Sequence, residues 1–337
     1  MAAVTRPARR LPRRAAWLRE HQWTAPERAV VIAALAILMG TLFVASYSLA
    51  LADPVPHRIN AGLVGTPTGN ERAVAAVEQV ANNNLAFHRY PSVAAALRAI
   101  DLQHVYAAVD LTGKAPTLYV ASAAGASVAR VLEQAARIDP TLRVVDSHPL
   151  EKDDPNGLDI FYLMLVATIV GFITIFQITA NAGKLELRHS VAVVVGLAVS
   201  ASLVFTLVDG PLLHRLDLPL AEIWGILGLH LLAVASFTSL MVVLLGRWAI
   251  VPCWLFFVVL GNSASGGAVS PPLLPRPFAL ISQWLPSGAT VTSLRDAVYF
   301  RSYQHVQPLA VIATWATVLF VAWLVVAHRR QTRLDDA

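Results

Sequence analysis

Long apolar runs separated by short polar segments dominate the pattern along this chain. A helix needs about 20 apolar residues to cross a bilayer core that is about 30 Å thick. The runs that meet this length are Ala29–Leu51, Leu158–Ala180, Ser190–Val208, Ile223–Gly246 and Leu309–Ala327. A further run, Trp248–Leu260, reaches it only if its ends extend to Gly246 and Asn262. The pattern predicts an α-helical polytopic membrane protein with six transmembrane helices, in which residues 158–327 form a five-helix block.

Residues 52–157, between the first two predicted helices, follow a different pattern of short β-type runs and helical repeats. The expected strands are His57–Val64, Val105–Leu111, Thr117–Ser122 and Leu142–Ser147. Helical repeats follow Asn70 and Ser92, and another contains Val128, Val131, Leu132 and Ala135. A segment of this size can bury a core of its own. We therefore predict a small α/β domain between helices 1 and 2.

The N-terminal residues 1–28 form a basic arm, which is either an interfacial helix containing Trp17 and Trp23 or a disordered segment. Residues 50–52 resemble a signal-peptide cleavage site. However, the preceding apolar run is longer than the usual 7–15 residues of a signal peptide. Thr24-Ala25-Pro26-Glu27 is also typical of a capping box at a helix start. These features favour a retained first helix over one cleaved after Ala52.

Residues 263–306, between the last two predicted helices, are too apolar for a free loop. Trp284 is of the type found at headgroup boundaries, and Ser287 is placed to cap a helix with Val291, Leu294 and Val298 on one face. We predict two short re-entrant or interfacial helices in this region.

The distribution of charge supports a membrane location. Charged residues make up 14% of the chain, whereas soluble domains carry about 25%. Arginines and lysines gather in residues 1–28, in the short loops containing Lys184, Arg188 and Arg247, and in the tail 328–337. Positive residues in short loops mark the cytoplasmic side. Both termini are therefore expected on the cytoplasmic side of the cell (inner) membrane. Residues 52–157 are expected on the outer side. The basic residues indicate topology and contact with lipid rather than nucleic acid.

Catalytic and cofactor motifs are weak in this sequence. His230 as base with Ser263 or Ser265 as nucleophile would suit a hydrolase, but Gly261-Asn262-Ser263-Ala264-Ser265 does not fit G-x-S-x-G. No Walker A motif or convincing metal-ligand spacing occurs, so we expect no enzyme activity and no cofactor. His230, inside the fourth predicted helix, is either a functional ionisable group or a neutral imidazole hydrogen-bonded between helices.

Two stretches, LGNSASGGAVSPPLLP (260–275) and WLPSGATVTSLRDAVYF (284–300), resemble YhgE/Pip-like (phage-infection-protein-like) membrane proteins and, more broadly, type-2 ABC transporter permeases. The resemblance implies a dimeric, homo- or heteromeric permease subunit that exports a hydrophobic or amphipathic compound with a separate ATPase. It also implies that Gly261, Asn262, Gly266 and Gly267 shape the bend after the fifth helix, at which relatives often carry proline in place of Ser263. Pro286 and Gly288 would then break the two outer helices, and Arg295 would anchor the second at the lipid headgroups.

One departure from this family keeps an alternative open. The second expected cytoplasmic loop, residues 181–189, is short for a surface that docks an ATPase. The alternative is a non-transporting envelope scaffold that binds partners through its outer domain.

Overall fold

The computed structural model describes residues 24–51, 55–182, 185–216 and 218–335. Residues 43–337 form one compact unit, and the contacts between different elements reported below lie within it. The expectations for residues 1–23, and the proposed cleavage after Ala52, fall outside the described residues.

Five helical stretches in the described residues are long and apolar enough to cross a membrane. They contain α2 (Ala25–Leu51), α7 (Asp159–Asn181), α8 (Leu187–Leu207), α9 (Leu220–Leu245) and α13 (Val306–Asp335). The prediction of a multi-pass membrane protein is therefore supported. The predicted capping box at the start of α2 is also confirmed. The Thr24 N–H donates a hydrogen bond to the Glu27 carboxylate at 2.7 Å, and the Glu27 N–H donates one to Thr24 Oγ1 at 3.4 Å.

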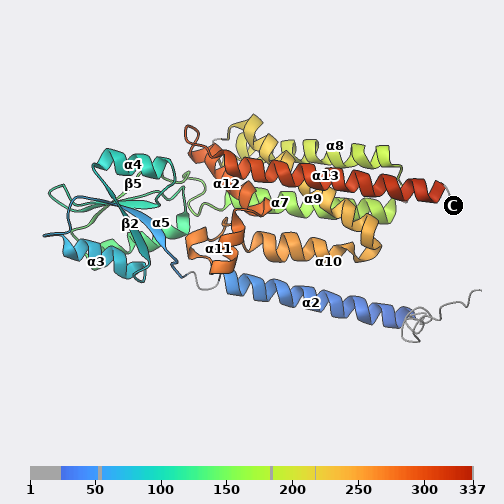
Figure 1. Cartoon of the computed structure of the whole chain (residues 1–337), viewed down its shortest axis with the longest axis horizontal. Coiled ribbons are helices and arrows are strands. Elements are labelled where there is room, and N and C mark those ends of the chain that lie inside the picture. Colours follow the sequence, from blue (N-terminus) through green and yellow to red (C-terminus); the bar gives the residue numbers. More distant parts are fainter. Residues whose placement is uncertain (1–23, 52–54, 183–184, 217, 336–337) are drawn as a thin grey trace, which may run out of the picture. The chain divides into compact units, whose positions relative to one another are not determined.

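One of these stretches, Leu220–Asn262, is interrupted at Gly246. Gly246 has a φ of +59°, a conformation that glycine adopts without steric cost. The chain continues as a 3₁₀ turn, η2 (Gly246–Ala249), then α10 (Ile250–Cys253) and the π-helix η3 (Trp254–Asn262). After the turn, α10 packs back against α9, as Figure 1 shows. The fourth and fifth predicted helices thus correspond to two helical segments on either side of this glycine.

Helix α9 is the centre of the membrane helices. It packs against α7, α8, α13 and the shorter α12 (Pro286–Tyr299). Close approach to α7 is allowed by Gly171, because a Cβ there would lie 2.8 Å from a methyl group of Val234. Small residues at such contacts let membrane helices pack tightly by van der Waals contact.

The domain between α2 and α7 contains a five-stranded sheet in the order β2-β1-β3-β4-β5. The strands are β1 (Ile59–Val64), β2 (Leu85–Tyr90), β3 (Ala107–Asp110), β4 (Thr117–Val120) and β5 (Arg143–Asp146). Only the β3–β4 pair is antiparallel. A small mixed sheet with helices is therefore present where the sequence predicted an α/β segment, although the sequence analysis missed β2.

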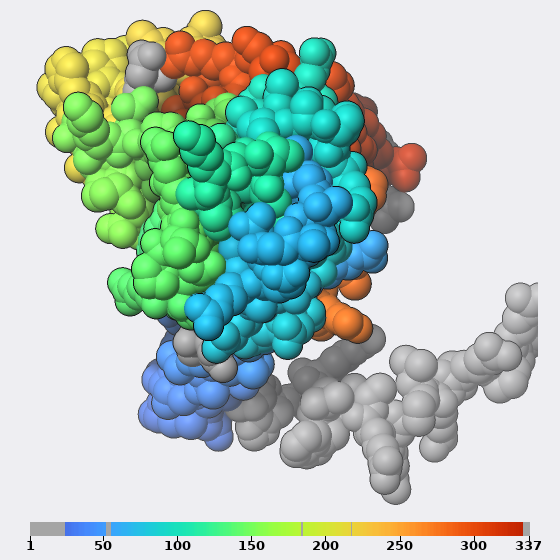
Figure 2. Space-filling model, turned by 90° about the vertical axis from the view of Figure 1, so that its left-hand side faces the viewer, coloured from blue at the N-terminus to red at the C-terminus, as the bar shows by residue number. Residues whose placement is uncertain are grey.

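Helices cover both faces of this sheet. Helix α4 (Val93–Asp101) lies on one face, and α3 (Glu71–Val80) and α5 (Ala126–Glu133), with the short α6 (Ala135–Ile138), on the other (Figure 1). Ser92 caps α4 as predicted, since its Oγ accepts the Ala95 N–H at 3.2 Å. Asn70 precedes α3 without a side-chain cap. Figure 2 shows the domain, coloured blue to green, in front of the membrane helices.

The segment 263–306 contains the 3₁₀ turn η4 (Pro271–Leu273), α11 (Arg276–Ser282) and α12. Two short helices were predicted here, but the predicted cap at Ser287 is wrong. Leu285 occupies the N-cap position, and Pro286 is the first residue of α12. Proline favours the first helical position because its ring fixes φ and its missing N–H needs no acceptor there.

Candidate functional site

The segment 263–306 forms a junction between the membrane helices and the α/β domain, and it enters both cores of that domain. Leu273 is fully buried in the core under α3 and α5, on one face of the sheet. Phe300, 2% exposed, is buried in the core under α4, on the other face. The His57 N–H also donates to the Pro272 carbonyl at 2.7 Å. The domain is therefore built partly from residues that lie between the last two membrane helices in the sequence.

Polar contacts reinforce the α12 side of this junction. The Asp296 carboxylate is buried and accepts from Gln103 Nε2 at 2.7 Å. It also accepts the His305 N–H at 3.0 Å. The His148 ring stacks on Phe300 with the ring centroids 4.9 Å apart. Hydrogen bonds to a buried charged group contribute about 1.5–3 kcal/mol each. The Gln103 bond, which joins the domain to α12, therefore makes independent motion of the domain costly.

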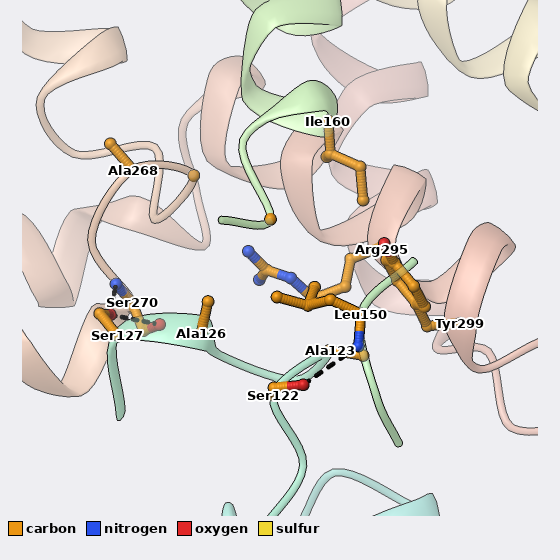
Figure 3. Close-up of a pocket in the computed structure, with 12 residues that line it drawn as sticks. Ser122, Ala123, Ala126, Ser127, Leu150, Ile160, Ala268, Ser270, Arg295 and Tyr299 are labelled. Atoms are coloured by element: carbon orange, nitrogen blue, oxygen red, sulfur yellow. Dashed lines mark hydrogen bonds between the residues drawn. The ribbon is translucent and has the colours of Figure 1, made fainter. Parts of the chain in front are cut away.

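A narrow pocket lies within the junction, as Figure 3 shows. Its wall comes from the domain (Ser122, Ala126, Ser127), from residues 267–270 and from α12. The Arg295 guanidinium points into it and donates to the Gly266 carbonyl at 3.1 Å. Burial lowers the pKa of Arg295 below its ordinary value. Opposite, Ser127 Oγ donates to Ser270 Oγ at 2.8 Å and accepts the Ser270 N–H at 2.9 Å.

The stretch 261–263, at the end of η3, lies deep in the protein. A Cβ on Gly261 would lie 2.8 Å from Ser287 Oγ, so glycine is required for this approach to α12. Ser263 shares a 2.8 Å hydrogen bond with Ser46 of α2, whose hydroxyl in turn reaches the Val259 carbonyl at 2.7 Å. Asn262 lies close to Tyr47 and is 2% exposed, but its amide makes no hydrogen bond of good geometry within the described residues.

The bend that follows has clear local causes. Ser265 Oγ donates to the Asn262 carbonyl at 2.8 Å and accepts the Gly267 N–H at 3.2 Å, which closes a tight turn. Gly266 has a φ of +73°, which L-residues rarely adopt. A Cβ on Gly267 would lie 2.6 Å from the Phe161 ring. The glycines and serines of this stretch therefore serve the geometry of the bend.

His230 connects three helices inside the membrane bundle. It is fully buried on α9, with Nε2 2.8 Å from Thr168 Oγ1 of α7 and Nδ1 2.9 Å from Thr290 Oγ1 of α12. Each threonine hydroxyl also has a backbone acceptor, Met164 for Thr168 at 3.0 Å and Pro286 for Thr290 at 2.7 Å. One ring nitrogen of a neutral imidazole donates and the other accepts, so both can be satisfied by the two hydroxyls. Both ring nitrogens are thus occupied by threonines, so His230 is not placed as a base for Ser263 or Ser265.

Replacing His230 by leucine tests the choice between a structural and a functional histidine. Each hydrogen bond between membrane helices contributes about 0.6 kcal/mol on average. Both threonines also keep backbone acceptors, at Met164 and Pro286. We expect His230→Leu to lower stability in detergent by about 1–2 kcal/mol and to leave function intact. Thermal unfolding and complementation of cells that lack the chain measure the two effects. Lost complementation with unchanged unfolding would identify a functional histidine instead.

No protein-family model, curated protein or solved structure matches this chain. The function is therefore inferred from the residues and contacts described above.

Proposed function

We propose that this chain is the membrane subunit of an exporter similar to type-2 ABC permeases. It crosses the cell membrane six times, with α9 and the segment Gly246–Asn262 as separate crossings. Both termini lie in the cytoplasm, because the short loops with Lys184, Arg188 and Arg247 face that side. The α/β domain then lies outside, and residues 263–306 meet it there.

The insertion of Leu273 and Phe300 into the two cores of the domain is the observation that carries this proposal. A domain that only binds partners needs no more than a flexible tether to its membrane anchor. Here the segment between the last two crossings is part of the domain itself. A shift of the membrane helices must therefore move the domain, as a transport cycle with a coupled outer domain requires.

The sequence and the helix surfaces support this proposal for the energy source and the cargo. The chain lacks a Walker A motif, so energy from ATP must come from a separate ATPase subunit. Large apolar side chains are exposed along the membrane helices, among them Val199, Leu203, Val204, Val318 and Val321. Such surfaces suit contact with lipid, with a second subunit or with a hydrophobic or amphipathic cargo that enters from the bilayer. We propose a dimer, with the same chain or a related one.

Gentle detergent extraction of the tagged chain, followed by quantitative mass spectrometry, tests the proposal. We expect an ATPase in a fixed ratio to this chain, and loss of cargo efflux from cells that lack the chain. An unrelated multi-pass protein with the same tag is the control. Repeated absence of an ATPase in several detergents would contradict the proposal.

A scaffold that binds envelope partners is the second candidate, and one feature of the sheet favours it. Strand β2 is an edge strand whose residues are partly or fully exposed. An edge strand offers unpaired backbone groups to which a partner strand can add. In the same extraction, an envelope protein in place of the ATPase would favour this function.

A further inference from the structure

Another pocket lies where the linker from the α/β domain meets the connection between α8 and α9. We propose that it binds a small amphipathic amine, which is an apolar body that carries one protonated amino group. In the proposed exporter this site holds the cargo at the outer end of the membrane helices, so the role of the ligand rests on the proposed function. Binding itself depends only on the pocket.

The walls of this pocket are mostly apolar. Its volume is about 370 Å³, within the range of about 300–1,000 Å³ that is typical of sites for small molecules. Leu216, Leu218 and Leu220 line it, together with Gly210 and Pro211. Leu216 and Leu218 also belong to the core of the membrane helices. This part of the wall is therefore held in place, and it suits the apolar body of a ligand.

The connection after α8 is shaped by hydrogen bonds. The π-helical turn η1 (Val208–Leu212) follows α8, and the His214 N–H then donates to the Gly210 carbonyl at 2.8 Å. His214, which also lines the pocket, has a φ of +53°. Arg215 donates to the Asp159 carboxylate from Nε at 2.8 Å and from Nη2 at 3.3 Å. This pair ties the connection to the first turn of α7 and holds the pocket open beside it.

Negative charge is left over around the pocket. The guanidinium of Arg215, which lines it, is balanced by Asp159. Glu151, which lines it from the linker, makes no ion pair within the described residues. Oδ2 of Asp209 is buried and has no hydrogen-bond partner in the same part of the chain. The base next to Glu151, Lys152, is exposed and does not line the pocket. A carboxylate without a counter-charge beside apolar walls favours a cationic ligand.

The pocket suits an organic cation better than a metal ion. Among the residues that the structure describes, no group of three or more His, Cys, Asp or Glu side chains could hold a metal ion. Metal ions require several ligand atoms around one point, whereas an ammonium group can pair with a single carboxylate. Leu212 and Leu213, next in sequence to residues that line the pocket, are exposed. They give the apolar part of such a ligand a contact at the edge of the bilayer.

Calorimetric titration of the full-length protein in phosphatidylcholine nanodiscs tests this inference. The probes are tryptamine and its neutral analogue tryptophol, in which a hydroxyl replaces the amino group, and empty nanodiscs are the blank. We expect saturable binding of tryptamine and about tenfold weaker binding of tryptophol, because hydrogen bonds between charged groups contribute about this much. Equal binding of the two probes, or no saturable binding of tryptamine, would overturn the inference.

Substitutions separate the carboxylate from the apolar wall. Glu151→Gln should weaken tryptamine binding about tenfold and leave tryptophol binding unchanged. Leu220→Ala, which shortens a lining side chain that is partly open to solvent, should weaken the binding of both probes. Asp153→Asn is the control, because it removes an exposed negative charge from the same linker but not from the pocket. Tryptamine binding that is equal in Glu151→Gln and Asp153→Asn would also contradict the inference.

Failure of this site and failure of the proposed function give different results. Tryptamine binding by a chain that never co-purifies with an ATPase would support the site and contradict the exporter. An ATPase in a fixed ratio to a chain that does not bind tryptamine would support the exporter and contradict the site.

Discussion

Alanine in place of Gly288 is expected to destabilise the protein severely. Gly288 lies in the first turn of α12, and a Cβ there would collide with the backbone carbonyl of Ser282, at the end of α11. The higher helix propensity of alanine compared with glycine offsets only about 1 kcal/mol of the cost of this collision. Overpacking costs about 1–3 kcal/mol, and more when backbone atoms must move. We expect a net loss of at least about 2 kcal/mol, measured as a lower unfolding midpoint in detergent.

Gly225→Ala is the matched control for this substitution. Gly225 lies in α9, and a Cβ there meets no atom within 4 Å. We expect its unfolding midpoint to stay the same or to rise slightly. Equal midpoints for Gly288→Ala and Gly225→Ala would show that α12 does not pack against Ser282 as described.

Truncation of Leu273 to alanine is expected to loosen the α/β domain from the membrane helices. Leu273 is fully buried in the core under α3 and α5. Leucine-to-alanine changes in cores cost about 2–5 kcal/mol, depending on how far the cavity collapses. We expect faster amide hydrogen exchange in β1, β3 and β4, with little change in α7 and α9. Hydrogen-exchange mass spectrometry resolves these segments separately.

Leu280→Ala provides the comparison, because Leu280 lies in the same segment but is 69% exposed. Its exchange pattern should match that of the unchanged protein. If both variants exchange alike, Leu273 contributes nothing to the domain core, and the proposed coupling of domain and membrane helices loses its main support.

The long apolar helices were predictable because only a few backbone conformations can satisfy their hydrogen bonds in lipid. Backbone groups must be satisfied within the helix, so length and apolarity largely determine a crossing. The predicted run Leu158–Ala180 differs from α7 by one residue at each end. Strand β2 was missed because its residues, Leu-Ala-Phe-His-Arg-Tyr, lie at the sheet edge and lack the alternation of a half-buried strand.

The junction could be predicted only in part. Glycines, serines and prolines at 261–275 indicated a bend, and the bend is present. The partners of Leu273 and Phe300 in the α/β domain were not predictable, because they lie more than 100 residues away in the sequence and depend on long-range packing. The error at Ser287 could have been avoided from the local sequence. The preceding Pro286 is typical of a first helical position and indicates that α12 begins one residue earlier.

In the proposed arrangement with six crossings, the winding of the segment Gly246–Asn262 has a consequence for the lipid around it. As an α-helix throughout, it would extend about 25 Å at about 1.5 Å per residue, less than the bilayer core of about 30 Å. Its second half is a π-helix, which is wound more widely and rises less per residue. We therefore expect hydrophobic mismatch on this side of the protein, with the surrounding leaflets thinned toward it. The protein would then prefer thin regions of membrane, and acyl-chain length would affect its stability.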